Sequence, residues 1–139
     1  MKFNRKANAN WKGSGKEGKG TLTTQSTILN ETQYSYKSRF ENGIGTNPEE
    51  LVAAALSGCF TMQLSFLLGE AGFTPNKLET EAKVTFEDGA IPAIHLELNG
   101  KVEEIKKEKF QEVAQKAKET CPISKLLNAT ITLTANLAT

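Results

Sequence analysis

The sequence predicts an α+β domain with a mostly antiparallel sheet. Strand-like segments with alternating or Thr-rich patterns stand at both ends of the chain, and one long apolar helical segment separates them. Helices and strands occur in runs rather than in strict alternation, which is typical of α+β proteins. With 139 residues and 38% apolar residues, the chain is long enough to bury one core, so we expect a single domain over residues 1–139.

The N-terminal third is predicted to hold three strands. Residues 3–13 carry apolar side chains at alternate positions, and the segments 21–27 and 34–40 are rich in Thr or aromatic residues. A glycine-rich turn, 14–20, separates the first two strands, and a second glycine-rich stretch, 41–47, follows the third. We therefore expect Arg39 to end a strand.

A long helix is predicted over residues 48–71. Asn47 suits the N-cap, Pro48 the first helical position, and Glu50 completes a capping-box spacing. Gly72 is a natural stop. Apolar residues occur nearly all round this helix, so we expect it to be buried on most sides, and a small sheet cannot cover it alone. A homodimer interface would bury the rest.

The C-terminal half adds a hairpin, two helices and a closing strand. Alternating apolar residues predict the two hairpin strands, with Gly89–Pro92 between them, and helical spacing predicts the first helix. The expected elements are strands at 77–88 and 93–103, helices at 106–120 and 121–129, and a strand at 130–138.

Composition excludes several partners. The 17 basic and 16 acidic residues leave a net charge of +1, with no basic excess for nucleic acid. The N-terminus lacks the apolar core of a secretory signal, and the run 51–68 contains too many polar residues for a confident membrane span. We expect a cytoplasmic protein whose thiols are reduced, metal-bound or transiently cycling.

Two cysteines carry the candidate chemistry. Cys59 lies in the middle of the long helix, where a cysteine taken alone is more simply a small core residue. Cys121 precedes Pro122 at a predicted helix start, where free N–H groups and the helix dipole stabilise a thiolate. One sheltered and one helix-terminal thiol suit a two-step thiol peroxidase, in which a sulfenic acid on one sulfur condenses with the other to a disulfide.

A buried nucleophilic thiol needs a nearby cation, and Arg39 is the best candidate, with a carboxylate to orient it. Glu49 points about 80° from Cys59 round the helix, whereas Glu50 points to the opposite side. Glu49 nevertheless lies about 15 Å from Cys59 along a straight axis. Either the Arg39–Glu49 pair reaches Cys59 from a second subunit, or the helix breaks between them.

Longer motifs resemble the OsmC/Ohr family of osmotically inducible and organic hydroperoxide resistance proteins. The resemblance rests on "GTNPEELVAAALSGCF" and "CPISKLL", and extends to "RFENGIGTNPEEL", "LLGEAGFTP" and "QKAKETCPISKLLNATITL". It covers nearly the whole chain and is strongest for the OsmC branch. It implies an OsmC-like fold, with curved antiparallel sheets around long central helices in an intertwined homodimer.

The resemblance also implies a function. It implies thiol-dependent reduction of organic hydroperoxides, with hydrogen peroxide reduced less well, in oxidative or osmotic stress defence. Cys59 would be the peroxidatic cysteine, Cys121 the resolving one, and Glu49 the active-site glutamate. No cofactor and no metal are implied, and the reductant would be a dithiol such as a lipoyl protein.

The active-site arginine that the resemblance implies has no counterpart at the same place in this sequence. In the Ohr branch it lies in the N-terminal glycine-rich turn, where this chain offers only Lys16 and Lys19. Arg39 is therefore assigned to stabilise the thiolate and bind the peroxide, and Glu49 to orient it. An apolar substrate pocket is also expected. Its candidate residues, each also compatible with plain core packing, are Phe40, Leu56, Phe60, Met62 and Phe66.

Three alternatives stand beside this reading. The protein could be a thiol redox sensor or a ligand-binding member of the family without efficient turnover. His95 and the two cysteines could hold a metal, although they lack C-x-x-C spacing. Both cysteines could also be inert core residues of a structural protein.

Overall fold

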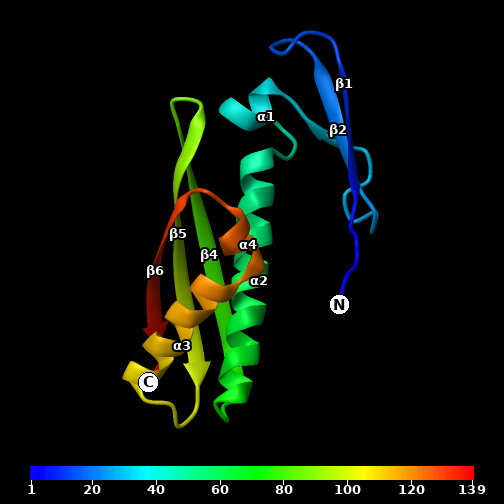
Figure 1. Cartoon of the computed structure of the whole chain (residues 1–139). Coiled ribbons are helices and arrows are strands. Elements are labelled where there is room, and N and C mark those ends of the chain that lie inside the picture. The colour runs from blue at the N-terminus through cyan, green and yellow to red at the C-terminus, as the bar shows by residue number, and fades with distance from the viewer. The chain divides into compact units, whose positions relative to one another are not determined.

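The computed structural model describes residues 1–139 and has the α+β architecture that the sequence predicts (Figure 1). Its contacts group the chain into two units, Met1–Leu51 and Val52–Thr139, so the single domain expected over 1–139 stays a prediction. The elements in chain order are β1 (Ala7–Lys12), β2 (Lys19–Thr24), β3 (Thr32–Tyr34), α1 (Tyr36–Phe40), α2 (Pro48–Glu70), β4 (Pro75–Glu87), β5 (Ala90–Val102), α3 (Lys107–Thr120), α4 (Pro122–Leu126) and β6 (Thr130–Leu137).

The first unit is built on an antiparallel sheet in the order β1-β2-β3. The β1–β2 hairpin was predicted, but the strand expected at 34–40 is wrong: β3 ends at Tyr34 and α1 follows. Ser35 and Ser38 form a capping box, in which the Ser35 N–H donates to Ser38 Oγ (2.9 Å) and the Ser38 N–H to Ser35 Oγ (3.2 Å). These bonds start a helix where alternating aromatic residues suggested a strand, so Arg39 lies in the last turn of α1.

Both ends of α2 agree with the sequence prediction. The Glu50 N–H donates to Asn47 Oδ1 at 2.8 Å, which is the N-cap bond expected there. The helix ends at Glu70, and Gly72 has a φ of +92°, a conformation that glycine adopts without steric cost. The helix is continuous from Pro48 to Glu70, so a break between Glu49 and Cys59 is excluded.

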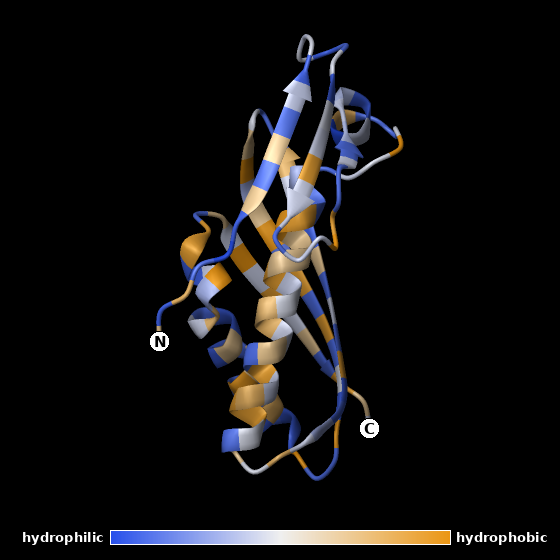
Figure 2. Cartoon of the chain, turned by 90° about the vertical axis from the view of Figure 1, so that its right-hand side faces the viewer, coloured by the Kyte–Doolittle hydropathy of each residue, from blue (hydrophilic) through white to orange (hydrophobic).

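Burial of α2 differs from the expectation. Only one stripe is fully buried, at every fourth residue: Leu56, Phe60, Leu64 and Leu68. Met62 and Phe66 are 63% and 65% exposed, and Figure 2 shows apolar colour along most of the helix. Burial on most sides is therefore wrong for the single chain, because one sheet covers one side. By length and composition α2 could also span a membrane, but the core helix of a soluble protein passes the same test.

The second unit is built on a sheet in the order β4-β5-β6. β4 and β5 form the predicted antiparallel hairpin, but its turn is tighter than expected. Glu87 pairs with Ala90, so only Asp88 and Gly89 connect the strands, with φ values of +49° and +78°. Positive φ at both positions is the mark of a type I′ hairpin turn, which matches the twist of the strands.

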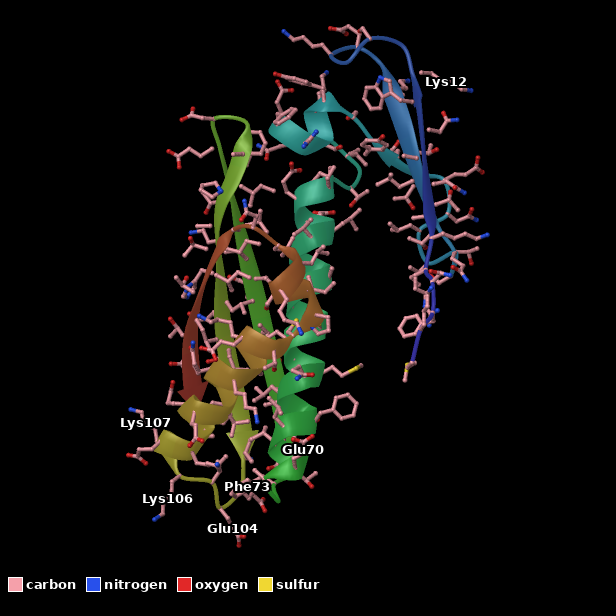
Figure 3. The ribbon with its side chains drawn as sticks, viewed as in Figure 1. Lys12, Glu70, Phe73, Glu104, Lys106 and Lys107 are labelled. Carbon is pink, nitrogen blue, oxygen red and sulfur yellow. The ribbon has the colours of Figure 1, made fainter.

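The closing strand β6 pairs with β5 in parallel, whereas every other strand pair in the molecule is antiparallel. Parallel neighbours need a crossover connection, and α3 and α4 supply it. Figure 3 shows this crossover beginning at Lys106 and Lys107, at the same end of the unit as Glu70 and Phe73. α3 approaches β5 closely: a Cβ on Gly100 would lie 2.6 Å from Phe110 Cζ, so only glycine fits there.

One hydrophobic core joins the long helix, the crossover and the sheet of the second unit. Its fully buried members come from α2, β5 and α3, and Cys121 is one of them, while Cys59 packs against it. The two cysteines, 62 residues apart in the sequence, are therefore brought together by the core itself.

Candidate active site

The two cysteines meet in the second unit. Cys59 lies in the fourth turn of α2, and Cys121 lies between α3 and α4, as C-cap of one and N-cap of the other. Both are free, and the Cys121 thiol donates to Cys59 Sγ at 2.6 Å. Two sulfurs from different elements are thus placed in direct contact.

The surroundings of this pair disfavour the thiolate of Cys59. Burial raises the pKa of the Cys59 thiol above its ordinary value, and the hydrogen bond from Cys121 raises it further. The backbone N–H of Ile123, in the first turn of α4, lowers the pKa because it donates to the sulfur. Cys121 itself is fully buried.

A polar link ties α2 to α3 beside the sulfurs. Gln63, one helical turn after Cys59, donates from Nε2 to Thr120 Oγ1 at 2.9 Å. The Thr120 hydroxyl in turn donates to the Lys116 carbonyl at 2.7 Å. Because Thr120 precedes Cys121, this chain of hydrogen bonds fixes the end of α3 against the turn of α2 that follows Cys59.

Arg39 and Glu49 form a separate pair in the first unit. Arg39 Nε lies 3.0 and 3.2 Å from the two carboxylate oxygens of Glu49, and Nη2 lies 2.8 Å from Oε1. Glu50 does not make this contact: its carboxylate accepts from the Thr46 hydroxyl at 2.7 Å. The forked geometry of the pair fixes the plane of the guanidinium.

Hydrogen bonds hold the segment carrying Arg39 against the start of α2. The buried Ser38 hydroxyl donates to the Thr46 carbonyl at 2.8 Å, and Asn47 Nδ2 donates to the Ser38 carbonyl at 3.1 Å. Sequence reasoning missed this network, although the S-x-x-S spacing at Ser35 and Ser38 signals a helix start.

A pocket of about 450 Å³ lies beside Arg39. Phe40 lies under the guanidinium, with Arg39 Cζ 5.1 Å from the ring centre. Sequence reasoning missed the other aromatic side chains of this pocket, although the alternating aromatics of 34–36 were a signal. The full lining is Trp11, Gly15, Lys16, Tyr34, Ser35, Tyr36, Arg39 and Phe40.

The five candidate substrate-pocket residues have different environments. Leu56 and Phe60 are fully buried in the core of the second unit, whereas Met62 and Phe66 are exposed on α2. Phe40 is 46% exposed on α1. A pocket built from these five residues stays a prediction.

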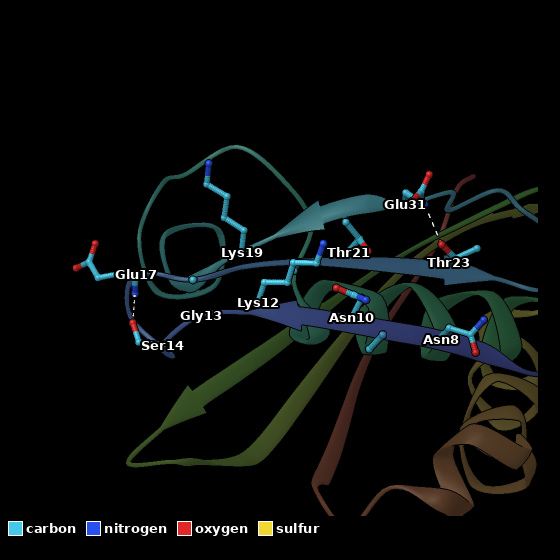
Figure 4. A pocket seen from close by; sticks show the side chains of 13 residues that line it. Asn8, Asn10, Lys12, Gly13, Ser14, Glu17, Lys19, Thr21, Thr23 and Glu31 are labelled. Atoms are coloured by element: carbon cyan, nitrogen blue, oxygen red, sulfur yellow. Dashed lines mark hydrogen bonds between the residues drawn. The ribbon is translucent and has the colours of Figure 1, made fainter.

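A larger pocket, of about 760 Å³, lies on the β1–β2 hairpin, and Figure 4 shows the side chains that line it. Most of them are polar, and two accept local hydrogen bonds: Ser14 Oγ accepts from the Glu17 N–H (3.0 Å) and Thr23 Oγ1 from the Glu31 N–H (2.9 Å). Neither a thiol nor an arginine lines it, so we do not assign it chemistry.

His95 has no cysteine neighbour. Its Nδ1 lies 2.6 Å from Thr132 Oγ1, and its Nε2 lies 3.1 Å from Thr134 Oγ1 and 3.3 Å from Glu97 Oε2. No group of three His, Cys, Asp or Glu side chains is arranged to hold a metal ion. The two cysteines instead contact each other.

Comparison with known proteins agrees with this geometry. Residues 40–136 match the family described as "OsmC-like protein". The chain is 45% identical over 137 residues to Peroxiredoxin OsmC of Escherichia coli (strain K12), with 96% of each chain covered. It is 30% identical over 98 residues to Organic hydroperoxide resistance protein-like 1 of Staphylococcus saprophyticus, covering 68% of this chain and 70% of that one.

A solved structure is also similar. The organic hydroperoxide resistance protein OhrB of Bacillus subtilis superposes with a TM-score of 0.70 at 26% identity, covering 98% of both chains. The sequence match and the fold point the same way, and the chain belongs to the OsmC-like family.

Proposed function

We propose that this protein is a cysteine-based hydroperoxide reductase that prefers organic hydroperoxides to hydrogen peroxide. The observation that carries the proposal is the contact between Cys59 and Cys121, whose sulfurs lie 2.6 Å apart. The names of its relatives, a peroxiredoxin and organic hydroperoxide resistance proteins, support the same reaction and a role in stress defence.

In the first step the Cys59 thiolate attacks one oxygen of the hydroperoxide. A sulfur–oxygen bond forms, the oxygen–oxygen bond breaks, and the alcohol leaves after taking up a proton. Cys59 is then a sulfenic acid. The Ile123 N–H, which already donates to this sulfur, supports the thiolate that starts the step.

In the second step the Cys121 sulfur attacks the Cys59 sulfur. The sulfur–sulfur bond forms, the sulfur–oxygen bond breaks, and the hydroxyl leaves as water with the proton of Cys121. An external dithiol, for which a lipoyl protein is the candidate, then reduces the disulfide by exchange and is itself oxidised. No cofactor or metal takes part.

Arg39 and Glu49 complete the proposed site. Burial raises the pKa of Cys59, so a positive charge is needed to make the thiolate the better populated form. The Arg39 guanidinium, fixed by Glu49, would supply that charge and bind the peroxide oxygens. Glu49 lies about 15 Å along the axis of α2 from Cys59 of the same chain, and on this proposal the pair acts on Cys59 of a second subunit.

The second subunit would cover the exposed side of α2. Met62 and Phe66 lie one turn apart on that side and are 63% and 65% exposed. Large apolar side chains exposed together on one helix face mark an interaction surface. A homodimer would bury this face, and Met62→Glu should shift sedimentation of the purified protein toward the monomer.

The test is consumption of cumene hydroperoxide and of hydrogen peroxide by the purified protein with a dithiol. We expect faster turnover of the organic peroxide. Cys59→Ser should abolish it, and Cys121→Ser should stop after one equivalent of peroxide has been consumed. No consumption by the unmodified protein, with both thiols unreactive until it is denatured, would refute the proposal.

The raised pKa of Cys59 favours one other candidate, a thiol redox sensor that forms the same disulfide with little turnover. Such a protein would oxidise once with stoichiometric peroxide and would not sustain consumption when the dithiol is in excess. The same experiment therefore separates the two functions. In both cases we expect the protein to work in the cytoplasm, without nucleic acid or membrane partners.

A further inference from the structure

Ser124 is the one buried side-chain oxygen or nitrogen in the protein that lacks a hydrogen-bond partner. It lies in α4, three residues after Cys121 and directly after Ile123, whose N–H donates to Cys59. A buried hydroxyl without a partner costs free energy, so its retention needs a reason.

The position of Ser124 in its helix suggests which atom its hydroxyl can hydrogen-bond. Cys121 is the N-cap of α4, so Ser124 is at the third helical position, N3. Side chains at N-cap and N3 lie together at a helix start, as Ser35 and Ser38 do at α1. At α4 the N-cap N–H is already used, because Cys121 N–H donates to the Ala117 carbonyl at 3.0 Å. The Cys121 N–H is therefore not available to the Ser124 hydroxyl, and the side chain of this same N-cap residue ends in a sulfur.

We propose that the Ser124 hydroxyl donates a hydrogen bond to the Cys121 sulfur whenever that sulfur is a thiolate. The proposal rests on the proposed function, in which Cys121 gains negative charge twice. In the protonated state the Cys121 thiol donates to Cys59, and its uncharged sulfur is only a weak acceptor for the Ser124 hydroxyl.

The two moments of charge are chemically distinct. During resolution, the proton of Cys121 passes to the departing hydroxyl while its sulfur forms the bond to Cys59. During reduction, a thiolate of the external dithiol attacks the Cys59 sulfur, the disulfide breaks, and Cys121 leaves with the electron pair. Cys121 is fully buried, so water does not solvate this charge and a hydroxyl donor stabilises it.

The first test uses Cys59→Ser, which leaves Cys121 as the only thiol. The rate at which iodoacetamide alkylates Cys121 is compared among four proteins, one that keeps Ser124 and three that carry Ser124→Ala, Ser124→Thr or Ser124→Val. Thr and Val have nearly the same shape but only Thr keeps the hydroxyl. At neutral pH we expect alkylation to be about tenfold slower with Ala and Val than with Ser and Thr. At strongly alkaline pH, where every thiol is ionised, the four rates should agree.

The second test uses the chain with both cysteines. Ser124→Ala should leave the rate of peroxide consumption in the first step unchanged and lengthen the lifetime of the Cys59 sulfenic acid, trapped with dimedone, about tenfold. Circular dichroism checks that each variant is folded, and the Thr and Val pair decides the matter if Ala alters packing.

Equal alkylation rates for Thr and Val at neutral pH would overturn the proposal, as would a sulfenic acid lifetime that Ser124→Ala does not change. Alkylation needs no peroxide. If peroxide is not turned over but Thr and Val still differ in alkylation rate, the peroxidase function is refuted and the role of Ser124 stands. If peroxide is turned over but Thr and Val are alkylated at equal rates, the role of Ser124 is refuted and the peroxidase function stands.

Discussion

The two shortest helices of the molecule, α1 and α4, have the same length and a serine at the same position, but the hydrogen bonding of the two serines is opposite. Each has five residues, and each has a serine at its third position. At α1 the Ser38 hydroxyl takes part in three hydrogen bonds, to Ser35 and Thr46. At α4 the Ser124 hydroxyl takes part in none.

The difference follows from the N-cap residue. The Ser35 hydroxyl accepts from the Ser38 N–H and the Ser35 N–H donates to the Ser38 hydroxyl, so the two side chains cap the α1 start reciprocally. The Cys121 N–H donates to the Ala117 carbonyl in α3, and the Cys121 thiol donates to Cys59 Sγ. One helix start fixes the segment that carries Arg39, and the other leaves the Ser124 hydroxyl without a partner, which is the hydroxyl that we propose for the Cys121 thiolate.

The largest expected effect comes from Arg39, in the last turn of α1. Arg39→Met should lower kcat/KM for cumene hydroperoxide about a hundredfold, because a donor that binds developing charge is lost. Glu49→Gln should cause a smaller loss, since the guanidinium is kept but less firmly oriented. The measurement is steady-state peroxide consumption over a range of peroxide concentrations.

Arg5→Met is the matched control for that experiment. Arg5 is exposed, and its side chain contacts only the Asn4 carbonyl and the ring of Phe3, so its loss should leave kcat/KM unchanged. Equal rates for Arg39→Met and Arg5→Met would remove Arg39 from the site and would leave α1 a purely structural helix.

The comparison of the two serines gives the second prediction. Ser38→Ala should lower the free energy of unfolding by about 1–2 kcal/mol, because it breaks the capping box and leaves the Ser35 N–H without its acceptor. Ser124→Ala should leave the stability unchanged or slightly raised, since it removes a buried hydroxyl that bonds to nothing.

Urea unfolding of the reduced protein at one fixed protein concentration measures both effects. A loss from Ser124→Ala as large as that from Ser38→Ala would show that the Ser124 hydroxyl has a partner in the resting state. The statement that Ser38 is hydrogen-bonded and Ser124 is not would then be wrong.

The smallest effect is a dependence of stability on alkaline pH. Burial raises the pKa of Cys59 in the folded state above its unfolded value, so the folded protein binds the thiol proton more tightly. The resulting stability is fully present below the unfolded pKa and is lost as pH rises through the folded pKa. The melting temperature of the reduced protein should therefore fall over this range, and Cys59→Ser should flatten the fall. A slope that Cys59→Ser leaves intact would assign it to other groups.

Much of this fold could be predicted from the sequence, because local patterns were unambiguous. The bounds of α2, α3 and β6 agree within a residue or so with their predicted ranges, since caps and periodicity mark them. The helix at 36–40 could not be separated from a strand by alternation alone, and the capping box decided it. The parallel pairing of β6 depends on which side of β5 the chain returns to, and no local pattern encodes that.

The candidate site divides in the same way. Helix phase relative to Cys59 favoured Glu49 over Glu50 as the partner of Arg39, and Glu49 is the residue that pairs with Arg39. The contact between Cys59 and Cys121 joins residues 62 positions apart, so spacing could not supply it. The chemistry of one sheltered and one helix-terminal thiol suggested that the two sulfurs react together, and the resemblance to a family gave each its role. Ser124 was missed because a missing hydrogen bond has no sequence signature.

The position of Cys121 in the crossover between β5 and β6 has a consequence for the protein while it is being synthesised. Cys121 lies between α3 and α4, after the whole of β5, so it is synthesised 62 residues later than Cys59. A chain leaving the ribosome exposes the Cys59 thiol while its partner is not yet synthesised. During that interval the growing chain carries Cys59 as its one thiol, and under the proposed function an oxidant would meet it with no resolving partner present.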